Sequence, residues 1–178
     1  MRTPLRTAAA LAAVPLLLAG CTGGGDGGGD RGEAAAGASA EPSSGATEVV
    51  GETTLPYSGR DGEAVVEVHA LRARGELVQL TLTFTAEGGD DGATASLYDL
   101  WGSAGSSPYL VDTASLNRHD VVAPEGGSPL APDVVGTSLS FGEPRSLSYT
   151  FAAPPEDVAS MDVYVGAAPP VTDVPVLR

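Results

Sequence analysis

Lysine is absent from this 178-residue chain, and cysteine, tryptophan and histidine are rare. Its basic residues are nine arginines, set against 23 Asp and Glu, so the formal net charge is −14. Such a surface is repelled by nucleic acid, because affinity for phosphate comes from Lys and Arg. Nucleic-acid binding is therefore the function that the composition favours least.

The single cysteine is Cys21. With no second thiol, the chain cannot form an internal disulfide, and beyond Cys21 it has no thiolate for catalysis or metal binding. The fold must depend on its hydrophobic core. A domain of roughly 130 residues can do so, since it buries about two-thirds of its unfolded surface.

Long hydrophobic runs are also missing. The uncharged stretch from Ala8 to Leu18 is about half the ~20 residues that a membrane-spanning helix needs. It follows Arg2 and Arg6, and a basic start before a short apolar run is typical of a secretory signal. Residues 1–20 are therefore predicted to be a signal peptide.

The tetrad Leu18-Ala19-Gly20-Cys21 resembles the lipobox of bacterial lipoproteins. In that family the Cys sulfur receives a diacylglyceryl group, and the chain is cut just before it. The resemblance implies a lipid anchor on Cys21, with the protein on the extracytoplasmic face of the cell membrane. The alternative is an ordinary secreted protein that happens to have Cys at this position.

A linker is predicted over residues 21–47. Its first part repeats Gly-Gly-Gly-Asp, and most of the rest is Ala, Ser, Gly, Glu and Pro. It has no large apolar side chain, so it cannot offset the entropy lost on ordering and should be disordered. The folded domain is expected over residues 48–178.

Apolar and polar residues alternate with a period of two in this domain, which predicts half-buried strands. The clearest case is residues 78–85, in which Val78, Leu80, Leu82 and Phe84 alternate with Gln and Thr. The other predicted strands are 49–55, 66–70, 96–101, 109–112, 134–141, 147–151 and 161–165.

Turn residues separate these segments, notably Gly88-Gly89-Asp90-Asp91-Gly92 and Pro154-Pro155. No stretch of ten residues has a helical period. Seven or eight short antiparallel strands predict an all-β domain, either a sandwich or a small barrel.

A second resemblance rests on several stretches of the domain, namely 78–85, 96–100, 141–143, 147–151, 154–155, 161–165 and 171–176. In these stretches the chain resembles immunoglobulin-like modules of unknown function in lipoproteins of high-GC Gram-positive bacteria. The resemblance implies an immunoglobulin-like β-sandwich and brings no catalytic residues.

Residues for catalysis are scarce. His69 and His119 are the only histidines, and they lack the spacing of metal ligands. His69 is expected on the polar face of its strand, and the segment 117–120 is expected to be an exposed loop. We therefore predict no enzyme activity, no metal and no cofactor.

Trp101 is the only tryptophan and lies beside a Gly/Ser-rich segment, near Tyr98 and Tyr109. Aromatic side chains at loops suit contact with a partner. The interpretation that we favour is a core Trp at one end of the sandwich. The alternative is a partner contact made by Trp101, Tyr98 and Tyr109.

The expected function is a noncatalytic interaction module, anchored by lipid at the cell envelope, with a protein or cell-wall partner. The alternative is an envelope enzyme or metal-binding accessory protein that uses His69, His119 and nearby carboxylates. The sequence itself names no ligand.

Overall fold

β-Strands make up almost all of the regular structure. The computed structural model describes residues 48–58, 60–90, 92–103 and 106–178. One short helix, α1 (Leu97–Trp101), accompanies eleven strands. The strands are β1 (Val49–Pro56), β2 (Glu63–His69), β3 (Leu71–Arg74), β4 (Leu77–Ala86), β5 (Thr94–Ser96), β6 (Tyr109–Asp112), β7 (Asn117–His119), β8 (Ser138–Ser140), β9 (Arg145–Ala152), β10 (Ser160–Tyr164) and β11 (Val171–Leu177).

The long strand β4 organises the first layer. β9 pairs with it antiparallel along one edge, from Leu77 to Phe84. Along its other edge, β3 pairs with the first part of β4 and β2 with the second part. β1 then pairs antiparallel with β2. This layer therefore has the order β1, β2, β4, β9, and β3 continues β2 after Ala70.

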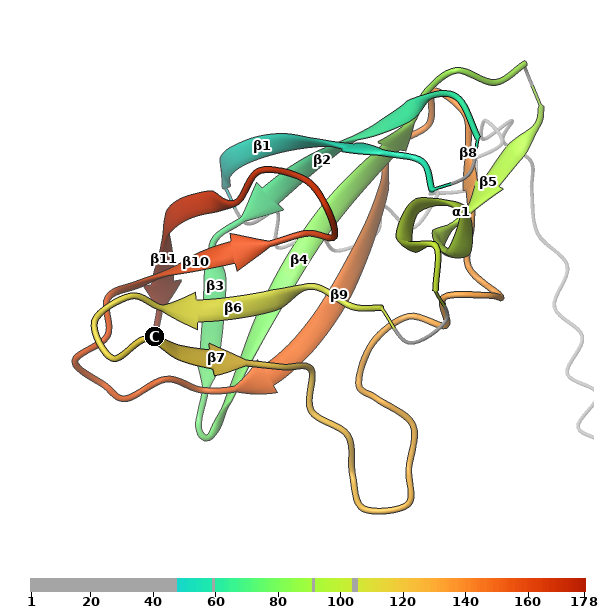
Figure 1. Ribbon diagram of the computed structural model, residues 1–178. Coiled ribbons are helices and arrows are strands. Elements are labelled where there is room, and N and C mark those ends of the chain that lie inside the picture. Colours follow the sequence, from blue (N-terminus) through green and yellow to red (C-terminus); the bar gives the residue numbers. More distant parts are fainter. Residues whose placement is uncertain (1–47, 59, 91, 104–105) are drawn as a thin grey trace, which may run out of the picture. The chain divides into compact units, whose positions relative to one another are not determined.

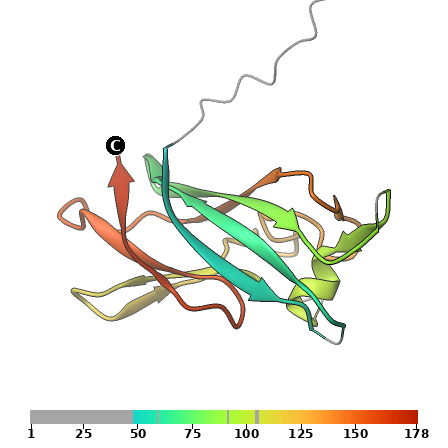
Figure 2. The same ribbon diagram turned by 90° about the horizontal axis from the view of Figure 1, so that it is seen from above.

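A second layer has the order β11, β10, β6, β7. Figure 1 shows these strands in front of β2, β4 and β9, and Figure 2 shows the same layers from above. The layers are joined where β11 pairs parallel with β3, at Val176 and Leu71. On the far side, Val121 bridges to Phe151 of β9, so the sandwich is nearly closed.

The core lies between the layers because alternate side chains of each strand point inward. Val78, Leu80, Leu82 and Phe84 are all fully buried, as the alternation predicts. Tyr149 and Phe151 of β9 and Val163 of β10 are buried with them.

The prediction of an all-β, sandwich-like fold is confirmed. The predicted number of seven or eight strands is too low, because β3, β5, β7 and β11 are short or lack clear alternation. The prediction that all strands are antiparallel is also wrong, since β11 runs parallel to β3. Within the described residues, no helix is long and apolar enough to span a membrane.

Three local predictions are wrong as well. The strand expected over 134–141 is limited to β8, because residues 134–136 form a turn. Residues 96–101 were expected to form a strand, but 97–101 form α1. Residues 117–120 were expected to form a loop, but 117–119 form β7, which pairs with β6 while its side chains remain largely exposed.

Candidate binding site

The helix α1 begins at a capping box. The Ser96 side chain accepts a hydrogen bond from the Asp99 N–H, and the Asp99 carboxylate accepts one from the Ser96 N–H at 2.7 Å. Gly102 ends the helix in the left-handed conformation, with φ 68°. These caps satisfy backbone groups that a five-residue helix would otherwise leave unpaired. They fix the position of Trp101 on the last turn.

Trp101 belongs to the core and is only 9% exposed. Its ring meets Phe84 edge-on, with centroids 6.3 Å apart. The Cε3–Cζ3 edge of the indole lies against Gly166, where an added Cβ would come within 3.1 Å of Cζ3. The expectation of a core Trp is confirmed, and the same ring also lines a surface hollow.

Tyr109 stands in a stack of three side chains on the outer face of the second layer. It pairs with Tyr164 across β6 and β10, and their rings are 4.7 Å apart and 8° from parallel. The Arg118 guanidinium, from β7, lies 3.9 Å from the Tyr109 ring centroid. Asp120 forms an ion pair with Arg118 at 2.7 Å. The stack therefore holds Tyr109 in one orientation.

A first hollow, of about 440 Å³, lies beside this stack and is open to solvent. Its size falls within the roughly 300–1,000 Å³ of ordinary ligand sites. It joins the end of α1, the start of β6 and the segment after β10. The lining residues are Trp101, Ser106, Ser107, Tyr109, Arg118, Gly166 and Ala167.

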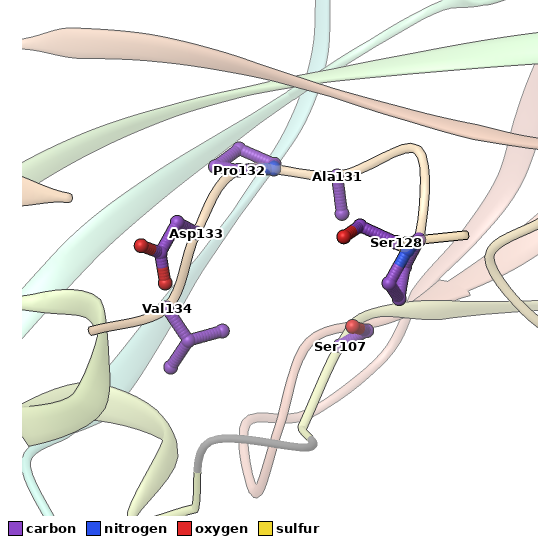
Figure 3. A pocket seen from close by; sticks show the side chains of 7 residues that line it. Ser107, Ser128, Ala131, Pro132, Asp133 and Val134 are labelled. Atoms are coloured by element: carbon purple, nitrogen blue, oxygen red, sulfur yellow. The ribbon is translucent and has the colours of Figure 1, made fainter. Parts of the chain in front are cut away.

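A second hollow, of about 350 Å³, meets the first at Ser107. Figure 3 shows its side chains around an open space, with Ser107 and Ser128 on one side and Asp133 and Val134 on the other. Asp133 is fixed in place because its Oδ1 accepts a hydrogen bond from the Val135 N–H at 3.0 Å. The two hollows thus adjoin at Ser107, and together we call them the Ser107 groove.

The structure brings two of the three predicted contact residues together. Trp101 and Tyr109 both line the Ser107 groove, whereas Tyr98 does not and is 47% exposed on α1. Cys21, the predicted lipid-attachment residue, lies outside the described residues.

The two histidines are not brought together. His69 Nε2 is hydrogen-bonded to Thr83 Oγ1, which also bonds to Ser146 Oγ at the start of β9. His119 Nδ1 instead donates to the Ala152 carbonyl, at the end of β9. Ser146 and Ala152 are six steps apart along β9, or about 20 Å at 3.3 Å per residue. The described residues include no cluster of three or more metal-ligating side chains.

Sequence reasoning missed Tyr164, Arg118, Ser107, Ser128 and Asp133. Ser107 lies only six residues after Trp101, but its Gly/Ser-rich segment indicates only a plain loop. The other four come from more distant segments, which the fold brings to the groove or to the Tyr109 ring at its rim. The cap of α1 left a signal that could have been recognised, because Ser96 and Asp99 have capping-box spacing and Gly102 follows.

The groove is therefore defined by its own geometry, a fixed aromatic stack beside two hollows that share Ser107. Its residue types match no catalytic or metal-binding motif that we recognise. No family model, no curated protein and no solved structure matches the chain.

Proposed function

We propose that this protein is a noncatalytic binding module that works outside the cell and is held to the membrane by lipid on Cys21. The anchor is supported by the tetrad Leu18-Ala19-Gly20-Cys21 and by the short apolar run before it. The binding role is supported by the Ser107 groove.

The observation that carries the proposal is the fixed orientation of Tyr109 at the rim of the groove. Tyr164 and Arg118 stack on this ring, and Asp120 holds Arg118. A side chain that is already ordered loses little entropy when a ligand binds, so more of the contact energy appears as affinity. Aromatic and Arg side chains are also the types that dominate binding energy at interfaces.

The chemistry of the lining favours binding over catalysis. Serine hydroxyls are present, but the lining residues include no histidine to activate them. Asp133 and Arg118 are exposed rather than enclosed in a water-free site. Groups of this kind hold and orient a ligand.

Site-specific photo-crosslinking tests this function. A photoreactive residue is placed at Ser107 of the full chain, in the bacterium that produces it, and a control residue is placed at Leu77, which is 41% exposed and outside the groove. We expect a higher-mass adduct from position 107 that position 77 does not give. Equal adducts at the two positions, or none at 107, would contradict the proposal.

A further inference from the structure

The chemical class of the ligand follows from the lining of the Ser107 groove, if the binding role proposed above is right. We propose that the groove binds an uncharged polysaccharide, with consecutive sugars lying across Ser107 from one hollow to the other. The argument rests on the shape of the groove, its hydrogen-bonding groups, its aromatic surface and its charge.

The shape suits a chain rather than a compact molecule. The hollows measure about 440 and 350 Å³, both are open to solvent, and Ser107 belongs to both. A small ligand is normally enclosed on most of its surface. Two open hollows in series instead offer adjoining places for the units of a polymer.

The hydrogen-bonding groups match those of a sugar. Ser106, Ser107 and Ser128 contribute hydroxyls, which both donate and accept, as sugar hydroxyls do. The Asp133 carboxylate accepts only, and Val135 fixes it through one oxygen. Its remaining lone pairs can accept from the hydroxyls of a sugar.

The aromatic groups supply the complementary surface, because one face of a sugar ring consists of C–H groups. Tyr109 is held at the rim, where Tyr164 covers one face of its ring and Arg118 the other, so it meets the groove by its edge. Trp101 closes the inner wall. Gly166, at φ +56°, leaves that wall free of a side chain. The apolar bodies of these two rings suit contact with the C–H groups of a sugar.

The charge of the groove and of the chain disfavours a charged polymer as the ligand. The described lining residues carry one cation, Arg118, and one carboxylate, Asp133, although the whole chain carries −14. A polyanion would be repelled by the chain as a whole. A nearly neutral groove on an acidic protein therefore favours an uncharged ligand.

A peptide is the rival occupant, and two observations disfavour it. β6 lies between β10 and β7, so this strand offers no free edge for an added peptide strand. The open hollows have mixed polar and apolar walls, whereas peptide recognition relies on enclosed apolar pockets for anchor side chains.

Calorimetry on the full lipidated chain tests the inference, in a detergent without a sugar headgroup. The probes are disaccharides and hexasaccharides of β-linked glucose, β-linked N-acetylglucosamine and α-linked mannose. We expect at least one hexasaccharide to bind and its disaccharide to bind roughly tenfold more weakly, a difference of about 1.4 kcal/mol. Because Trp101 is the only Trp and lines the groove, its fluorescence should change on binding.

Three variants locate the binding. Ser128→Trp should block the second hollow and Tyr109→Ala should remove the stacked ring, each weakening binding by roughly tenfold or more. The control is Tyr98→Ala, which removes an exposed aromatic ring outside the groove and should leave the affinity unchanged.

The inference is overturned if no hexasaccharide binds at millimolar concentration, or if Ser128→Trp and Tyr109→Ala bind as the parent does. It is also overturned if a proline-rich peptide binds at the groove and the sugars do not. A crosslink at position 107 without any sugar binding would rule out a polysaccharide as the ligand. It would leave the proposed binding function supported.

Discussion

Thr83 lies on the outer face of β4 and yet is only 6% exposed. Its hydroxyl bonds to His69 Nε2 at 2.9 Å and to Ser146 Oγ at 2.8 Å, linking β2, β4 and β9. The alternation of residues 78–85 predicts the correct face for this side chain, but a half-buried strand would leave that face open to solvent, and at Thr83 it is covered. Because β4 is a central strand, polar side chains of the strands on either side of it cover Thr83.

This burial leads to a prediction for neighbouring positions. Leu82→Ala should lower the free energy of unfolding by about 2–5 kcal/mol, because Leu82 is fully buried. Thr83→Val keeps the shape but removes both hydrogen bonds, so it should cost about 1–3 kcal/mol. Urea denaturation of the purified variants measures both changes.

Thr81→Val is the matched control, since Thr81 lies on the same face and is only half-buried. It should stay within about 0.5 kcal/mol of the parent, as surface substitutions usually do. If Thr83→Val were as mild as Thr81→Val, the bonds between the three strands would contribute nothing measurable.

At the scale of the element, α1 depends on an ionised carboxylate. The Ser96 backbone N–H donates to Asp99 and holds the pKa of this carboxyl below its usual value, with further help from the Ser96 hydroxyl. At the β6–β7 turn, the Ser115 hydroxyl in the same way lowers the pKa of Asp112, with help from the Ala114 N–H. In both places the folded chain favours the charged form.

The lowered pKa values of Asp99 and Asp112 determine how the stability of the fold changes with pH. A carboxylate with a depressed pKa stabilises the fold above its unfolded pKa of about 3.9, and the contribution is lost as pH falls through the lower folded value. The free energy of unfolding should therefore decline below about pH 4. Asp99→Asn should make this decline shallower in urea titrations at pH 7, 4 and 3, and an unchanged slope would argue against the role of the cap.

Elements whose signal is local could be predicted from the sequence. The alternation in residues 78–85 lies within β4, and residues 109–112 match β6. The strand β7 was missed because Asn117-Arg118-His119 has no apolar alternation, and its pairing with β6 comes from the hairpin. The groove could not be predicted, because the pairing of Tyr109 with Tyr164 depends on strand order, which no local pattern encodes.

At the scale of the whole molecule, stability without a disulfide rests on the near-closure of the sandwich. The parallel pairing of β3 with β11 joins the layers on one side. On the other side, the Val122 N–H donates to the Thr150 carbonyl at 2.9 Å and Val121 bridges to Phe151. Few strand edges remain open, which lowers the risk of edge-to-edge aggregation.

The proposed anchor leads to a prediction for the full chain. Cys21→Ala should leave the precursor uncut by the lipoprotein peptidase and release some protein into the medium, since the lipid has no sulfur to join. Membrane fractionation and immunoblotting measure both effects. Thr22→Ala, the neighbouring change, should be processed as the parent is. A Cys21→Ala chain that stays in the membrane and is trimmed normally would contradict the lipoprotein assignment.

The strand β1 runs from the point where the chain enters the domain to the region of α1. It begins beside Glu48, where the chain enters the domain, and just beyond its end the Ser58 N–H donates to the Asp99 carbonyl of α1 at 2.7 Å. Eight residues of strand span about 26 Å at 3.3 Å per residue. Antiparallel hydrogen bonds lie across the strands, so tension between the proposed tether and a ligand at the groove would shear the β1–β2 ladder along its length. Bonds sheared together resist a pull better than bonds peeled one at a time, so the whole β1–β2 ladder would oppose such a pull.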